Sequence, residues 1–104
     1  MEFVEYIKYQ SHSPSYRLAH GISVRGEKFG LLFYNSKGPK LIFVRSGPWI
    51  HPIFFSSRLD LKNWIQSRFP ALAEKERLRI EEKLLQVLSK LAEKGLIVET
   101  TVDS

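Results

Sequence analysis

Hydrophobic and polar residues follow a strand-like pattern in three short stretches in the first half of the chain. Residues 22–25 alternate with a period of two, residues 31–34 are rich in side chains that suit a pleated surface, and residues 40–45 form a third apolar stretch. Glycine, proline and asparagine separate these stretches at 26–28 and 35–39. Three short strands joined by tight turns predict an antiparallel sheet in which consecutive strands pair.

The second half of the chain changes to a helical period. Residues 61–69 place their apolar side chains close to one face, and Asp60 stands where an N-cap belongs. Residues 74–94 form the clearest element, because apolar residues recur every three to four positions and Gly95 follows at the usual helix end. We therefore expect two helices here.

Residues 47–55 are the least regular part of the sequence, with two prolines and three aromatic side chains. They are compatible with a short helix starting near Pro48 or with irregular chain. The cluster fits either a part of the core or an exposed surface that docks a partner. Residues 96–98 are apolar again and can fold back onto the core.

The order of elements predicts the α+β class with a winged helix-turn-helix-like arrangement. In such a fold a three-stranded antiparallel sheet is followed by two or three helices. The chain of 104 residues has room for one domain, which we place at residues 17–98. Residues 1–16 are expected to form an N-terminal arm or loop, and residues 99–104 a tail.

Charge is distributed unevenly along the chain, whose net charge is +5 and pI about 9.6. Residues 1–70 hold ten Lys and Arg against four acids, whereas residues 71–104 hold six against seven. The basic front part favours an acidic partner. No cysteine is present, which excludes disulfides and thiolate metal sites. No apolar stretch long enough for a membrane span and no secretory signal is found, so we expect a cytoplasmic protein without a membrane partner.

Groups that carry catalysis are scarce. His12, His20 and His51 lie in separate segments without the spacing of metal ligands, and Asp60 is explained as a helix cap. The alternating acids and bases of residues 74–83 indicate a solvated helical face. No phosphate-binding loop or nucleophile motif occurs. We expect no enzyme activity, no cofactor and no metal.

Binding is the remaining class of function, and the stretch 40–45 is the candidate element. A three-stranded sheet has two edges with unpaired N–H and C=O groups, and an extended peptide can pair with such an edge as an added strand. The alternative is that this apolar stretch only packs both faces of a small sheet.

Three segments resemble known peptide chaperones. ISVRGEKFGLLFY over residues 22–34 and KLIFVRS over 40–46 resemble the mycofactocin-system peptide chaperone family. LSKLAEKGLI over residues 88–97 is similar to the end of the wider group that includes the pyrroloquinoline-quinone peptide chaperone. The resemblance covers roughly residues 17–98. It departs from the family at residues 47–55, where a regular helix is usual.

The resemblance implies a precursor-peptide recognition element without catalytic activity. Such a domain binds the leader of a ribosomally synthesised precursor peptide beside its third strand and delivers it to a radical S-adenosylmethionine (radical SAM) maturation enzyme. Carried over to this chain, the peptide would lie along the third strand and the last helix, and Lys40 and Arg45 would pair with acids of the leader. The implied peptide-binding residues are Lys40, Leu41, Ile42, Phe43, Val44, Arg45, Leu84, Leu85, Leu88 and Leu91.

Two other functions fit the same element order. A winged-helix nucleic-acid-binding protein would use the basic front part, with Lys62, Asn63, Gln66 and Arg68 on the helix that enters the groove. A structural module would instead pair its open edge with a second copy of the chain and form a homodimer.

Overall fold

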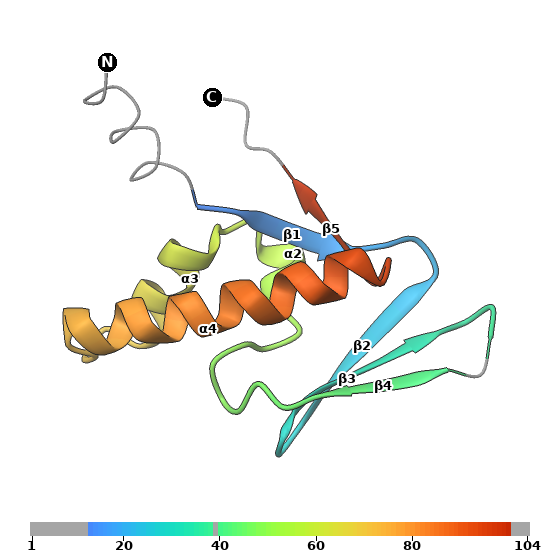
Figure 1. Cartoon of the computed structure of the whole chain (residues 1–104), viewed down its shortest axis with the longest axis horizontal. Coiled ribbons are helices and arrows are strands. Elements are labelled where there is room, and N and C mark those ends of the chain that lie inside the picture. The colour runs from blue at the N-terminus through green and yellow to red at the C-terminus, as the bar shows by residue number, and fades with distance from the viewer. Residues whose placement is uncertain (1–12, 39, 101–104) are drawn as a thin grey trace.

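The computed structural model describes residues 13–38 and 40–100 of the chain. Its elements, in chain order, are β1 (Ser15–Leu18), β2 (Ile22–Glu27), β3 (Gly30–Asn35), β4 (Leu41–Val44), α2 (Phe54–Ser57), α3 (Leu61–Arg68), α4 (Glu74–Glu93) and β5 (Ile97–Thr100). Figure 1 shows β2, β3 and β4 extending away from the helical part of the molecule, while β1 and β5 lie side by side. The predicted α+β class, with a three-stranded antiparallel sheet followed by helices, is confirmed.

Strands β2, β3 and β4 pair antiparallel in chain order. Gly30 opens β3 with a φ of +149°, and a Cβ at this position would collide with the carbonyl oxygen of Val44. Glycine therefore lets the start of β3 and the end of β4 approach closely. The N–H of Gly47 then donates to the carbonyl oxygen of Phe29 at 3.0 Å, which ties the chain leaving β4 to the β2–β3 turn.

One face of this sheet shares a core with the helices. Leu31, Phe33 and Val44 are buried there, and the indole N–H of Trp64 donates to the carbonyl oxygen of Trp49 at 2.9 Å. That bond satisfies the polar atom of a large side chain in the interior. The buried residues that the helices contribute are Phe54, Phe55, Leu61, Trp64, Ile65, Leu84, Leu88 and Leu91.

Local signals set the ends of the two long helices as predicted. The Asp60 carboxylate accepts the N–H of Asn63 at 2.8 Å and caps α3. Gly95 follows α4 with a φ of +80°. The N–H of Leu96 donates to the carbonyl oxygen of Leu91 at 3.0 Å, and that of Gly95 to Ala92, also at 3.0 Å. These two bonds form a Schellman motif, which satisfies carbonyls at the helix end.

The two-stranded sheet of β1 and β5 was not predicted. Ser15 pairs with Thr100 and Leu18 with Ile97, so β1 begins inside the segment expected to be an arm or loop, and β5 runs into the expected tail. Tyr16 and Ile97 are buried in the core. Four-residue strands show too little alternation to be recognised when their partner lies at the other end of the domain. The rest of the predicted arm and tail, residues 1–12 and 101–104, lies outside the described residues.

The aromatic side chains of residues 47–55 lie in the core or pack against it. Ile50, Phe54 and Phe55 are buried, while Ile53 is exposed. The short helix exists, but it begins at Phe54 rather than near Pro48. The aromatic residues of this segment therefore extend the packing between the sheet and α3.

Replacement of Gly30 by alanine tests the close approach of β3 to β4. We expect Gly30→Ala to lower the free energy of unfolding by at least about 2 kcal/mol, because the new methyl group clashes with Val44 and the backbone conformation is strained. Urea denaturation followed by circular dichroism measures the change. Gly38→Ala is the matched control, since a Cβ at Gly38 meets no atom within 4 Å. Equal effects of the two replacements would contradict the expectation.

Candidate functional site

Strand β4 is an edge of its sheet. Within the described residues its one strand neighbour is β3, because the order of the sheet is β2-β3-β4. Leu41 and Phe43 are 59% and 62% exposed, whereas Val44 is buried and Ile42 is half-buried. The side chains of β4 thus alternate between the core face and an open outer face.

The register of the sheet shows which backbone groups of β4 are unused. Only two residues separate Glu27 from Gly30, so this pair exchanges both hydrogen bonds of the hairpin, and bonded pairs then alternate along the ladder. The N–H of Ser36 donates to the carbonyl oxygen of Gly21 at 3.0 Å. These two residues are a further bonded pair of the same ladder, which agrees with this alternation. It follows that alternate residues of β3, beginning with Leu31, direct their backbone groups toward β4.

The same alternation applies to the β3–β4 ladder. Leu31 faces Val44 and Phe33 faces Ile42 in bonded pairs. The backbone N–H and C=O groups of Val44 and Ile42 are therefore directed toward β3 and bond to it. Leu41 and Phe43 direct theirs to the open edge. The residues with free backbone groups are therefore also the residues with exposed apolar side chains. We call this arrangement of Leu41 and Phe43 the β4 edge.

The outer face beside the β4 edge is apolar. The ring of Phe43 lies 5.6 Å from that of Phe29 between centroids, and Tyr34 stands opposite Leu41 with 42% of its surface exposed. Leu32, opposite Phe43, is itself buried. Large apolar side chains gathered on one exposed face are typical of an interaction surface.

A groove lies where β4 ends, between the chain that follows it and α4. It encloses about 390 Å³. Arg45, Ser46, Gly47 and Trp49 line the side after β4, and Arg79, Ile80, Lys83, Leu84 and Val87 line the side of α4. We call these nine residues the basic groove, because three are cations and none is an acid.

The cations of the basic groove have no ion-pair partner among the described residues. The ion pairs of α4 instead join Arg77 to Glu74 at 3.9 Å and to Glu81 at 3.5 Å. Burial raises the pKa of the Glu81 carboxyl, an effect that Arg77 opposes. The hydroxyl of Ser46 is buried at the wall of the groove and, within the described structure, has no hydrogen-bond partner.

The structure brings together some of the predicted binding residues and separates others. Leu41, Ile42, Phe43 and Val44 form β4, Lys40 is exposed just before it, and Arg45 leads into the basic groove. On α4, Leu84 lines the groove and Leu85 is half-buried against the core. Leu88 and Leu91 are fully enclosed in the core and do not line the groove.

Several residues of the groove were missed from the sequence. Arg79 and Lys83 are exposed, as expected for the predicted solvated helical face, and they also flank the groove. Ile80 and Val87 share a helical stripe with Leu84, and this spacing could have indicated them. Which stripe faces the chain after β4 depends on the rotation of the helix, which spacing does not determine.

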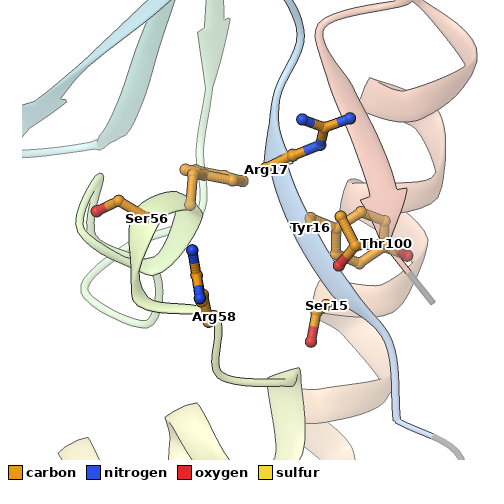
Figure 2. A pocket seen from close by; sticks show the side chains of 7 residues that line it. Ser15, Tyr16, Arg17, Ser56, Arg58 and Thr100 are labelled. Carbon is orange, nitrogen blue, oxygen red and sulfur yellow. The ribbon is translucent and has the colours of Figure 1, made fainter. Parts of the chain in front are cut away.

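A second pocket of about 450 Å³ lies between β1 and α2. Figure 2 shows the side chain of Arg17 on the β5 side and that of Arg58 on the α2 side, so the two guanidinium groups do not converge. The hydroxyl of Ser15 is buried in its wall and has no hydrogen-bond partner in the described structure. Burial is the main cause that raises the pKa of the Tyr16 phenol. Among the described residues that line this pocket, no base lies beside a nucleophile.

The described part of the chain shows neither a cluster of metal-ligating side chains nor a membrane-spanning helix. No group of three potential metal-ligating side chains occurs among residues 13–38 and 40–100. In that same part of the chain, no helix combines the length and the apolar character that crossing a bilayer requires. Nδ1 of His51 accepts the N–H of Ile53 at 3.1 Å, which gives this histidine a local structural role. His12 lies outside the described residues.

Comparison of the chain with models of protein families, with curated proteins and with solved structures found no match in any of the three. The resemblance of residues 22–46 to peptide chaperones therefore stays a prediction from the sequence. The function of the chain has to be inferred from the geometry and charge of the β4 edge and the basic groove.

Replacement of Leu88 tests the placement of α4. Leu88 is 1% exposed, so we expect Leu88→Asp to cost more than about 4 kcal/mol and to unfold the protein, because an unpaired carboxylate would be buried. Gln86→Asp, at an exposed position of the same helix, should change stability by about 0.5 kcal/mol. Thermal unfolding followed by circular dichroism distinguishes the two. A folded Leu88→Asp variant would show that α4 is turned differently.

Proposed function

We propose that this chain is a non-catalytic peptide chaperone. It binds the leader of a ribosomally synthesised precursor peptide as an added β-strand at the β4 edge and presents it to a radical SAM maturation enzyme. The observation that carries the proposal is the coincidence, at Leu41 and Phe43, of free backbone groups with exposed apolar side chains. An extended peptide uses both at once.

The backbone of the peptide would take the place of a fourth strand. Leu41 and Phe43 each direct one donor, the N–H, and one acceptor, the C=O, to the open edge. The two residues are two positions apart, which is the spacing that a partner strand requires. These main-chain bonds give affinity for extended peptides in general. Preference for one peptide then has to come from the side chains beside the edge.

The side chains of such a peptide would alternate between two surroundings. One set would lie next to Leu41 and Phe43 on the outer face, and the other next to Ile42 and Val44 on the core face. Both neighbourhoods are apolar. A leader with apolar residues at successive positions of its pairing segment fits them. Its side chains would cover the exposed surface of Leu41 and Phe43 and the half-exposed surface of Ile42.

Delivery to a radical SAM enzyme rests on the resemblance of residues 22–46 to peptide chaperones. In that role the enzyme supplies the cofactor and the chemistry, and this chain supplies the peptide-binding surface. The cytoplasm, where precursor peptides are made, is the location that this function implies.

Calorimetric titration with a leader peptide tests the proposal directly. The ligand is the leader segment of the short precursor peptide encoded beside the gene. We expect saturable one-to-one binding at micromolar affinity or tighter. Its dependence on salt should be far smaller than that of nucleic-acid binding, because main-chain bonds and apolar contacts dominate the edge. No heat of binding under several buffer conditions would count against the proposal.

Nucleic-acid binding remains the alternative function, and the unpaired cations of the basic groove beside Trp49 favour it. On α3 the exposed polar residues include Lys62 and Arg68, although Arg68 lies 4.8 Å over the ring of Trp64. Binding of DNA or RNA would weaken steeply with salt, because each phosphate contact releases counterions. Titration with a random-sequence duplex at two salt concentrations separates this function from peptide binding.

Proline at Phe43 tests the role of the β4 edge in main-chain bonding. Phe43→Pro removes an N–H that points away from β3, so the sheet should remain paired while the added strand loses a bond. Phe43→Ala is the control, since it removes the same ring and keeps the N–H. We expect leader binding to be about tenfold weaker for Phe43→Pro than for Phe43→Ala. Equal affinities, with circular dichroism showing both variants folded, would exclude a bond at this position.

A further inference from the structure

The basic groove has features of a recognition site that the β4 edge does not explain. Arg45 directly follows Val44, so a peptide that pairs with β4 meets the groove at the end of the paired segment. The floor is apolar, with Trp49, Ile80 and Leu84 among its residues. The groove therefore continues the binding surface past the strand, but with a different chemistry.

Charge distinguishes the groove from the edge. Three cations, Arg45, Arg79 and Lys83, surround the same 390 Å³ and no carboxylate lies among the lining residues. Within the described structure none of the three is in an ion pair, whereas Arg25 and Arg77 each have an acidic neighbour. Like charges held together beside an apolar floor repel one another, and a bound anion relieves that repulsion.

The wall of the groove does not add a reachable hydrogen-bond donor. Ser46 is 8% exposed, and its hydroxyl lies beside Gly30 without accessible surface and without a partner among the described residues. The cations therefore carry the polar chemistry of the groove. Cations around an apolar floor suit a carboxylate on a short aliphatic stem.

We infer that the basic groove selects a peptide with an acidic residue, Asp or Glu, flanking the apolar segment that pairs with β4. This inference rests on the proposed function, and it specifies the class of peptide. The acid belongs at one end of the apolar segment, because Arg45, Arg79 and Lys83 gather where β4 ends and not along the edge.

Selection from a display library of random linear peptides tests this inference. The immobilised chain should enrich peptides with an apolar stretch and Asp or Glu at a fixed place on one side of it. The double variant Arg79→Glu with Lys83→Glu should enrich peptides without a fixed acid, or peptides with Lys or Arg at that place. Both side chains are exposed, so the variant should keep its fold, which circular dichroism checks.

A control variant with the same net charge distinguishes an effect of the groove from an effect of the overall charge of the chain. Lys75→Glu with Lys90→Glu changes two exposed cations of the same helix outside the groove, and it should retain the acidic preference. One enriched peptide and its Asp→Asn or Glu→Gln counterpart are then titrated. The original chain should bind the neutral peptide about tenfold more weakly, and the groove variant should bind both equally.

The outcomes distinguish the two proposals. Enrichment of apolar peptides without a fixed acid overturns the role of the groove and leaves peptide binding at the β4 edge intact. An acidic preference that survives in the groove variant shows that the acid binds elsewhere, which also overturns the inference. Enrichment of no peptide at all refutes the peptide-binding function, and the inference with it.

Discussion

The close approach of Gly30 to the end of β4 is the contact on which both binding surfaces depend. A side chain at this point would collide with Val44, so β4 can end against the start of β3 only because glycine stands there. The bond from Gly47 to Phe29 then fixes the direction in which the chain leaves the strand. That direction carries Arg45 and Trp49 toward α4 and so creates the basic groove.

An open sheet edge with exposed apolar side chains is a liability that folded proteins normally reduce. In this chain the liability is concentrated in β4, at Leu41 and Phe43, and Lys40 and Arg45 flank it with charge. Flanking cations disfavour pairing with a second copy, which would bring like charges together, and favour a partner that carries acids. The edge and the groove thus point to one extended, partly acidic ligand.

Much of the fold was predictable because its signals are local. The turn before β3 lies at residues 28–29 rather than at the expected 26–28, because Gly26 and Glu27 belong to β2. With the turn around Gly38 it still joins the three strands in chain order. Asp60 and Gly95 mark helix ends through bonds to their own neighbours. The pairing of β1 with β5 was not predictable. It joins the two ends of the domain, and neither four-residue strand shows a pattern long enough to be distinguished from irregular chain.

The sequence by itself was enough to identify residues 40–45 as an apolar strand and a candidate sheet edge. It also determined that the basic charge lies in the front part of the chain. The tertiary structure decided which side chains a ligand can reach. Leu84, Leu88 and Leu91 share one apolar stripe of α4, yet of these three only Leu84 lines the groove. Arg79 and Lys83 are exposed, as predicted, and they also flank the groove. Helical spacing defines a stripe, but the rotation of the helix within the core decides which part of it is buried, because the packing of α4 against α3 and β5 is a tertiary interaction.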